Sequence, residues 1–342
     1  MIQYSDQYMG KRTEEYKKDR VQEDRLEQLN SELEPSELRR IENSTPPKYP
    51  ITFIVGAPRS ATTLTHQILA QTNYYSYISN FIARFWKVPS LGSEIAETLG
   101  IYTEDPMSFR SNFGRTKGWK EPHQFNYFWK KWLLYDADHQ MDEDLIRSNI
   151  NAIQFRKQLG AIEGVNDKPL LFKSLYTGMQ IPYLHDVLED IRVVVTLRHP
   201  YYQAQSNLLG RRAFFGNDKD WFSLKPSNYS ELRHLTPFEQ VVAQIYSILK
   251  EIESGIASLD SDAVKLSYYD QFMQSPREQV QEILSMINIS SPQIDTIPDH
   301  FDVRNNNRLS EPEHDKLQFY VTEYFGPSAD YVPFESYMRI NS

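Results

Sequence analysis

The sequence contains no cysteine. This absence excludes a disulfide scaffold, cysteine-ligated zinc, thiolate catalysis and iron–sulfur chemistry. Long hydrophobic runs are also missing, because the most apolar stretches, Ile51–Val55 and Val193–Leu197, have the length of a strand and are far too short to span a membrane. Charged residues appear early at the N-terminus, and no apolar core of signal-peptide length follows them. We therefore expect a cytoplasmic protein with no membrane span.

Positive charge is in deficit. The 342 residues include 46 acidic and 37 basic side chains, which gives a formal net charge of −9. Such a balance argues against a nucleic-acid partner or a general affinity for anionic lipid, although it leaves room for a local basic pocket. Hydrophobic residues make up 40% of the chain, which is enough for a packed interior. The length suggests one large α/β domain, or such a domain with an added arm.

The first 48 residues differ from the rest in their charge pattern. They carry alternating charges of both signs and sparse apolar residues, and the segment closes with Ser44-Thr45-Pro46-Pro47. Charges at helical spacing favour an exposed helix, which the two prolines would end. We interpret residues 1–48 as a charged helical arm and residues 49–342 as the main domain. The arm could be a solvated helix packed on the domain, a lid, or a partner-binding surface that forms a homo-oligomer.

The main domain alternates between strand-like and helix-like segments. This order predicts an α/β fold with a central, mainly parallel sheet flanked by helices. Residues from about 75 to 150 form a more helical, tryptophan-rich insertion. The predicted strands are Ile51–Val55, Leu170–Lys173, Arg192–Leu197 and Ala263–Ser267, and the predicted helices are Thr62–Gln71, Met179–Leu188, Tyr201–Arg212, Phe238–Ser254 and Pro276–Ile287.

A candidate anion site follows the first predicted strand. The chain there reads Gly56-Ala57-Pro58-Arg59-Ser60-Ala61-Thr62-Thr63 and then enters a helix. Backbone N–H groups and the helix dipole bind anions in this setting. Compared with the nucleoside-triphosphatase loop G-x-x-x-x-G-K-[ST], Ala61 replaces the second glycine and Thr62 replaces the lysine. Losing that lysine counts against a standard ATPase, whereas Arg59 could face a terminal anionic group.

These residues resemble the 5′-phosphosulfate loop of sulfotransferases, which reads P-[KR]-[ST]-G-T-T. The resemblance implies a three-layer P-loop fold and a donor, 3′-phosphoadenosine 5′-phosphosulfate (PAPS), with no metal. It also implies which residues cradle the 5′-phosphosulfate: Arg59, Ser60, Ala61, Thr62 and Thr63. Where the family usually has glycine, this chain has Ala61, so either a methyl group must fit near the phosphate or the backbone must adopt ordinary dihedral angles.

Three further patches extend the resemblance. Arg198 at a predicted strand end and Ser206 eight positions later match the pair that holds the 3′-phosphate in sulfotransferases, where a guanidinium supplies a fork of donors. The segment around Val264–Pro276 is similar to the family's strand, tyrosine, acid and proline element. Counting back from the proline favours Tyr269 as the nucleotide-contacting residue, and counting from the strand favours Tyr268. Arg304 is the candidate from the C-terminal phosphate loop.

The catalytic base is harder to assign. Lys173 matches a lysine of cytosolic sulfotransferases, but Leu175 occupies the place of their catalytic histidine. The segment around Glu121 and His123 resembles the Glu-x-His-Phe-Phe element of carbohydrate sulfotransferases, so we expect Glu121 as the base and His123 as the second choice. Other candidates are Asp105, His185 and His199. The aromatic residues nearby could shape a sugar or aromatic pocket or could simply pack: Trp119, Phe125, Tyr127, Phe128, Trp129 and Trp132.

These observations favour a PAPS-dependent sulfotransferase. It would transfer a sulfuryl group to a hydroxyl of a carbohydrate or small natural product, with Lys173 assisting at the transferring group. Two alternatives remain open at this point. One is a nucleotide kinase on a related P-loop fold, and the other is a catalytically silent nucleotide-binding or interaction module.

Overall fold

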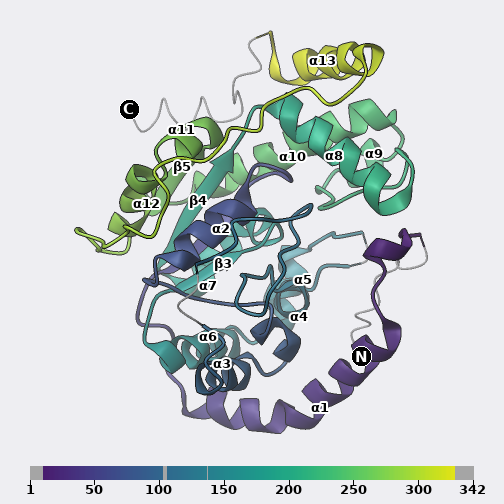
Figure 1. Cartoon of the computed structure of the whole chain (residues 1–342). Coiled ribbons are helices and arrows are strands. Elements are labelled where there is room, and N and C mark those ends of the chain that lie inside the picture. The colour runs from purple at the N-terminus through teal and green to yellow at the C-terminus, as the bar shows by residue number, and fades with distance from the viewer. Residues whose placement is uncertain (1–10, 103–105, 137, 328–342) are drawn as a thin grey trace.

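Five parallel strands form the centre of the molecule. The computed structural model describes residues 11–102, 106–136 and 138–327. The strand order is β2-β3-β1-β4-β5, and every neighbouring pair is parallel (Figure 1). The strands are β1 (Ile51–Val55), β2 (Ser76–Tyr77), β3 (Leu170–Lys173), β4 (Ile191–Leu197) and β5 (Val264–Tyr268). The predicted α/β fold with a parallel sheet is therefore confirmed.

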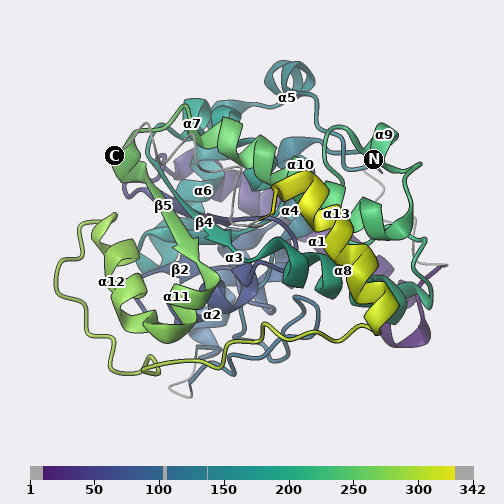
Figure 2. The same ribbon diagram turned by 90° about the horizontal axis from the view of Figure 1, so that it is seen from above.

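Helices cover both faces of this sheet because successive strand residues point to opposite sides. Phe53 packs in the cluster formed with helices α4, α6, α7 and α10, whereas its neighbour Ile54 packs in the cluster formed with α2, α11 and α12. Every residue of β1 is buried, as expected for a strand covered on both faces. Figure 2 shows α13 crossing over α8 and α10, with which it packs.

The helices follow the predicted order. The α-helices are α1 (Arg20–Asn43), α2 (Thr62–Gln71), α3 (Pro89–Thr98), α4 (Asn126–Leu133), α5 (Glu143–Asn149), α6 (Ala152–Asn166), α7 (Ile181–Leu188), α8 (Pro200–Phe215), α9 (Tyr229–Leu232), α10 (Pro237–Ile256), α11 (Tyr269–Gln274), α12 (Pro276–Ser285) and α13 (Glu311–Phe325). The short 3₁₀ helices are η1 (Glu14–Tyr16), η2 (Ile82–Phe85), η3 (Thr177–Met179) and η4 (Ser261–Ala263).

The region from 75 to 150 contributes more than helices. Its first residues form β2 at the edge of the sheet, a strand that sequence patterning missed because two residues show no periodicity. Most of its aromatic side chains belong to the core, and Trp129 packs on Phe53 and Phe172 of β1 and β3. Trp119 is the exception, since 58% of it is exposed. Of the aromatic residues singled out from the sequence, Tyr127 is half-buried and four are buried: Phe125, Phe128, Trp129 and Trp132.

The charged N-terminal segment contains one long helix, α1, which ends at Asn43 just before Ser44. Glu37 is buried in this helix and accepts hydrogen bonds from the backbone N–H groups of Ser90 (3.1 Å) and Leu91 (3.3 Å) in the first turn of α3. A carboxylate at this position satisfies free helix donors and opposes the positive end of the helix dipole. Asn30, also buried, binds the backbone on either side of Phe85. The arm is therefore attached through specific polar contacts.

Among the described residues, no helix combines the length and the apolar content needed to cross a bilayer. Within the same residues, no group of three or more histidine and acidic side chains is arranged to hold a metal ion.

Candidate functional site

The carboxyl ends of β1 and β4 meet at the point where the strand order changes direction. From β1 the chain crosses to β2 on one side of the sheet, and from β4 it continues to β5 on the other. Ligands bind in the crevice outside such strand ends in open α/β sheets. The segment from Gly56 to Thr63 connects β1 to α2 at this point, and Arg198 follows β4 directly.

Gly56 opens the loop in a conformation that requires glycine. Its φ is +155°, and a Cβ at this position would lie 2.5 Å from Thr196 Oγ1 and 2.7 Å from the Thr196 carbonyl oxygen. The loop therefore turns by passing directly against β4. Only the missing side chain allows this approach.

The buried Ser60 side chain stabilises the loop by hydrogen bonds. It is 1% exposed, its hydroxyl lies 2.8 Å from the carbonyl oxygen of Ala57, and the Thr196 hydroxyl lies 2.7 Å from it. Its side chain thus connects the loop to itself and to β4. Ser60 holds the shape of the loop, and what it offers a ligand is its backbone.

Two non-glycine residues adopt left-handed backbone conformations in this loop. Arg59 has φ +72° and Ala61 has φ +80°, and each such residue costs about 1–2 kcal/mol. The backbone at Ala61 thus keeps the conformation that glycine normally provides, at the N-cap position of α2. Thr62 and Thr63 then form the first turn of α2, whose N–H groups have no acceptor within the helix.

Arg59 joins the loop to α8. Its Nε donates to Ser206 Oγ at 2.9 Å, and its guanidinium lies 5.2 Å from the ring centre of Phe113. Desolvation lowers the pKa of Arg59 to about 10, and the positive charges of Arg198 and Arg308 act in the same direction. Arg59 remains charged at neutral pH, so Arg59, Arg198 and Arg308 form a group of three positive charges.

Arg198 occupies the centre of this cation group. Its Nη1 donates to the carbonyl oxygen of Arg59 (3.3 Å), its Nη2 to that of Arg304 (2.6 Å) and its Nε to Asn305 Oδ1 (3.0 Å). The guanidinium lies 4.5 Å from the ring centre of Tyr269. Tyr268 is the last residue of β5, and Tyr269 is the first residue of α11.

The segment from 301 to 308 has no regular secondary structure, and polar bonds hold it over this strand end. The Arg304 N–H donates to Tyr269 Oη (2.9 Å), and the residue is exposed. Gln205 of α8 donates to the Asn306 carbonyl (3.0 Å) and accepts from the Arg308 N–H (2.7 Å). Asn305, Gln205 and Arg308 were not singled out from the sequence, because their meeting depends on a crossing of distant segments.

Lys173 ends β3 beside the same loop. It is 4% exposed, and its Nζ makes no recorded hydrogen bond or ion pair with the described residues. Desolvation, with a further contribution from Arg59, lowers the pKa of Lys173 to about 7. A buried amine without a partner is costly, so the site around Lys173 is set up for an anion.

His66 of α2 is a neighbour that sequence reasoning missed. It is 2% exposed, and its Nε2 is buried without a hydrogen-bond partner among the described residues. Desolvation lowers the pKa of His66 to about 3, and Lys173 and His123 add to this effect. The imidazole is therefore neutral at physiological pH. No signal in the sequence marks it, since a histidine within a helix usually packs.

Glu121 is buried, with 3% of its surface exposed, and both of its carboxylate oxygens accept hydrogen bonds. Oε2 accepts from Gln67 Nε2 of α2 at 2.6 Å, and Oε1 accepts from the Ser108 N–H at 2.8 Å. The Glu121 backbone carbonyl accepts from the Asn80 N–H at 2.8 Å. The structure therefore brings Glu121 next to Asn80, and its neighbour Pro122 pairs with Ser79.

His123 is exposed, and its tautomer follows from its contacts. Its Nδ1 accepts from the Phe125 N–H at 2.9 Å, so in the neutral ring the proton is on Nε2. His123 therefore presents an N–H donor rather than a proton acceptor to the solvent side.

The remaining candidates lie elsewhere. His185 is in α7, and His199 caps α8 by accepting from the Tyr201 N–H at 3.2 Å. Asp105 lies outside the described residues.

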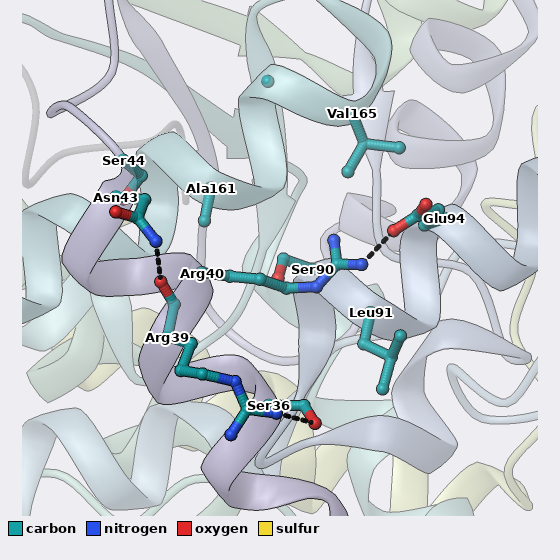
Figure 3. A pocket seen from close by; sticks show the side chains of 11 residues that line it. Ser36, Arg39, Arg40, Asn43, Ser44, Ser90, Leu91, Glu94, Ala161 and Val165 are labelled. Carbon is teal, nitrogen blue, oxygen red and sulfur yellow. Dashed lines mark hydrogen bonds and ion pairs between the residues drawn. The ribbon is translucent and has the colours of Figure 1, made fainter.

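A separate hollow opens between α1, α3 and α6 (Figure 3). It shares no lining residue with the site at the strand ends. Arg40 pairs with Glu94 across it, and Arg39 Nη2 donates to Ser36 Oγ at 2.9 Å. Its cations therefore have partners within the protein, in contrast to Lys173.

Comparisons with known proteins agree with this geometry. A model of the sulfotransferase family matches residues 50–293, from just before β1 to just after α12. The chain belongs to the sulfotransferase family. No curated protein sequence matches it.

Among solved structures, this sulfotransferase is similar to sulfotransferase STF1 from Mycobacterium tuberculosis H37Rv. The two chains are 12% identical with a TM-score of 0.51, over 90% of this chain and 81% of that one. Sulfotransferase STF9 from Mycobacterium avium is 12% identical, with a TM-score of 0.47 over 86% and 77% of the two chains. The likeness to STF1 supports the shared fold.

The strain at Ala61 leads to a stability prediction. We expect Ala61→Gly to raise the free energy of unfolding by about 1 kcal/mol, because glycine adopts a φ of +80° without a Cβ penalty. Denaturant titration of the purified protein measures the change. Ala161→Gly in α6 is the matched control and should lower stability by about 0.5–1 kcal/mol. A loss of stability in Ala61→Gly would contradict the strain argument.

Proposed function

We propose that this sulfotransferase uses PAPS as its donor and transfers the sulfuryl group to a hydroxyl of a carbohydrate or small natural product. One observation carries the proposal: the Nε of Arg59, in the phosphate loop, donates to Ser206 on α8, and Arg198 donates to the Arg59 carbonyl. The family resemblance assigns Arg59 to the 5′-phosphosulfate, and Arg198 and Ser206 to the 3′-phosphate of the same nucleotide. Hydrogen bonds connect these three residues to one another.

The donor set fits a ligand with two anionic ends. Arg59, Ala61, Thr62 and Thr63 would cradle the 5′-phosphosulfate, with Ser60 shaping the loop and the free N–H groups of α2 acting as donors. Arg198 and Ser206 would hold the 3′-phosphate, and Arg304 would contribute through its backbone and its exposed guanidinium. Tyr269, whose ring lies under Arg198, would position that arginine. Like charges held this close favour an anionic partner.

Lys173 would supply a positive charge at the transferring group. PAPS, when bound, provides the sulfuryl group and leaves as 3′-phosphoadenosine 5′-phosphate (PAP). A preplaced cation stabilises the charge that develops on the leaving phosphate during such a transfer. The buried, unpartnered Nζ beside Arg59 suits this role, and it needs no metal.

Glu121 would take the proton from the acceptor hydroxyl. Each carboxylate oxygen has two lone pairs, so the bonds from Gln67 and Ser108 orient the group and leave an acceptor position on each oxygen. His123, with its proton on Nε2, would donate a hydrogen bond that orients the acceptor. Because Glu121 is buried, the acceptor hydroxyl would react away from bulk water.

The proposal also covers the setting of the reaction. It includes a cytoplasmic protein, no nucleic-acid partner and a homo-oligomer formed through the N-terminal arm. The composition supports the first two, and the exposed apolar side chains of α1, among them Val21 and Leu29, support the third.

The donor is tested by calorimetric titration with PAP, with ATP as the control ligand. We expect PAP to bind. ATP should bind much more weakly, because it lacks the 3′-phosphate that Arg198 and Ser206 would hold. Arg198→Ala should abolish measurable PAP binding and preserve the folded state, as judged by thermal unfolding. Arg192→Ala, at the other end of β4, is the matched control. Absence of PAP binding to the unmodified protein would refute the proposed function.

PAP affinity should depend on pH through Lys173. The free protein has a Lys173 pKa of about 7, and a bound polyanion raises it, so the complex binds more protons above pH 7. Affinity should therefore be highest below pH 7 and fall by up to about tenfold per pH unit as the pH rises above it. Titrations in buffers of different ionisation enthalpy count the proton taken up. Lys173→Met should remove this dependence, and equal proton uptake in that variant would assign it to another group.

The base is tested by Glu121→Gln. Removing a general base typically costs about 10²–10⁴-fold in rate, so kcat should fall by at least about 100-fold. PAP affinity should stay unchanged. The amide oxygen can still accept from the Ser108 N–H, but the new NH2 group faces Gln67, whose amide must turn its oxygen toward it to keep a hydrogen bond. The unfolding temperature shows whether this exchange costs stability. Glu121→Asp should recover part of the rate. A fully active Glu121→Gln variant would place the base elsewhere.

A further inference from the structure

A two-residue hairpin lies against the phosphate loop. Asn112 and Arg115 pair antiparallel and exchange both backbone hydrogen bonds, at 2.9 and 3.0 Å. The residues between them, Phe113 and Gly114, have φ of +48° and +84°. Hairpin turns with positive φ at both central positions favour asparagine, aspartate or glycine. Phe113 is therefore held in a conformation that a bulky side chain disfavours, and its surroundings must stabilise it there.

Both residues at the tip of this hairpin contact the phosphate loop. The guanidinium of Arg59 lies 5.2 Å from the ring centre of Phe113, which is within the range of a cation–π interaction. A Cβ at Gly114 would lie 3.6 Å from Thr63 Oγ1 and 3.5 Å from Gln124 Nε2. The tip therefore lies close to both ends of the segment from 59 to 63.

The ring of Phe113 also packs on aromatic residues at helix α8. It meets the rings of Phe214 and Phe222 edge to face, with centres 5.8 and 6.1 Å apart. Phe214 belongs to α8. The same helix carries Ser206, whose hydroxyl accepts from Arg59 Nε at 2.9 Å. Helix α8 therefore supports both the ring that Arg59 faces and the hydroxyl to which Arg59 donates.

Tyr16 of the N-terminal arm connects this hairpin to α8. Its ring stacks on Phe214 with centres 3.8 Å apart, and only 4% of the residue is exposed. The Tyr16 Oη accepts from Asn112 Nδ2 (2.9 Å), and the Tyr16 carbonyl accepts from Arg115 Nη2 (3.3 Å). The two residues that pair at the base of the hairpin tip are thus both bonded to Tyr16.

Thr13 attaches the same segment of the arm to the last turn of α8. Its N–H donates to the Phe214 carbonyl (2.8 Å), and its Oγ1 donates to the Ala213 carbonyl (2.9 Å). Carbonyl groups in the last turn of a helix have no donor within the helix. The contacts of Thr13 satisfy two of them, so this part of the arm has one defined place on α8.

These contacts leave one edge of the Arg59 guanidinium for a ligand. Its Nε is bonded to Ser206, whereas neither Nη atom has a recorded hydrogen bond or ion pair with the described part of the chain. A guanidinium binds an anion through such a fork of donors. Holding the group in place before the ligand arrives reduces the side-chain entropy that binding costs.

We propose that Phe113 positions Arg59 for the donor and that Tyr16 holds Phe113 in this place. Both are positioning residues, because they act through the Arg59 guanidinium. Residues 13–16 of the N-terminal arm then contribute to the donor site, in addition to their packing on α8. This inference rests on the proposed function, because it takes the anion that Arg59 receives to be the 5′-phosphosulfate of PAPS.

Phe113→Leu tests the role of the ring. Leucine keeps an apolar side chain and the same backbone strain, but it removes the aromatic face. PAP affinity, measured by calorimetry, should fall by about three- to tenfold, the range expected for ordering one long side chain. Phe113→Tyr should retain the affinity, because it keeps the ring. Phe319→Leu is the matched control, since Phe319 lies 59% exposed on α13, and it should bind PAP with full affinity.

A double-mutant cycle separates positioning from general packing. In the Arg59→Gln background, Phe113→Leu should leave PAP affinity nearly unchanged, because no guanidinium is left to position. A ring with a merely structural role would weaken binding by the same factor in both backgrounds. Equal losses in the two backgrounds, or full affinity in Phe113→Leu alone, would overturn the inference. Thermal unfolding of each variant checks the fold.

Tyr16→Leu tests the contribution of the arm. It removes the stack on Phe214 and the acceptor for Asn112, so PAP affinity should fall by a factor similar to that of Phe113→Leu. The combined variant should show no further loss, because both changes act on one contact. Additive losses would overturn the role of Tyr16. If Tyr16→Leu does not fold, Asn112→Ala removes the same hydrogen bond from the hairpin side, and full PAP affinity in that variant would overturn it.

The reactivity of Arg59 gives a readout that does not depend on PAP. Phenylglyoxal modifies arginine side chains, and mass spectrometry measures the rate at Arg59 relative to the exposed Arg39 of α1. We expect Arg59 to react faster in Phe113→Leu and in Tyr16→Leu than in the unmodified protein, because the ring no longer holds the guanidinium. Equal rates in all three proteins would overturn the inference.

The outcomes separate the two proposals. PAP binding with unchanged affinity in Phe113→Leu would overturn the positioning role and leave the proposed function in place. If PAP does not bind to the unmodified protein, the proposed function is refuted. The modification rate of Arg59 then judges the positioning role by itself, and it does the same for the cycle if binding to Arg59→Gln is too weak to measure.

Discussion

The contact between Arg59 and Arg198 is the constraint on which the site depends. Two guanidinium groups of like charge are brought together because one follows β1, the other follows β4, and these strands are neighbours with their carboxyl ends at the same edge of the sheet. Backbone carbonyls, an asparagine and a serine accept their hydrogen bonds. These neutral partners satisfy donors without cancelling charge. The two positive charges therefore stay close together in the folded protein.

Lys173 and Arg84 are two further cations whose side chains have no hydrogen-bonded acceptor among the described residues. Lys173 is buried without a partner, and its lowered pKa measures how poorly the protein solvates its charge. The acidic exterior implied by a net charge of −9 and a focused cationic interior are compatible, because net charge sums over a surface whereas binding depends on local charges and their surroundings.

Several residues hold the backbone of the site in place. The Ser60 hydroxyl bonds to Ala57 within its own loop and to Thr196 of β4. Glu121 connects Gln67 of α2 to the separate segment that contains Ser108. Ala61 keeps a left-handed conformation that glycine adopts without strain. Such strain persists where the surrounding structure over-determines the backbone, and here the turn at Gly56 and the start of α2 fix both ends of the loop.

The sequence by itself determined the order of the elements. Apolar runs such as Ile51–Val55 and Leu170–Lys173 matched the strands to the residue, because strands buried on both faces read as continuous apolar segments. The positions of the Gly56–Thr63 loop and of Arg198 directly after strands were also predicted, because they depend on local sequence alone. Edge strand β2 was missed, because two residues show no periodicity. For the aromatic residues of α4, the sequence did not decide between core packing and a role in a ligand pocket.

Tertiary structure decided the rest. The association of Arg59 with Ser206, the return of residues 301–308 over β4 and the placement of Glu121 beside Asn80 all join segments separated by tens of residues or more. The same is true of His66, whose pKa Lys173 and His123 help to lower. Local patterning determines elements because neighbouring residues share one backbone geometry. Which side chains meet at a site depends on how those elements pack, and that is a property of the whole chain.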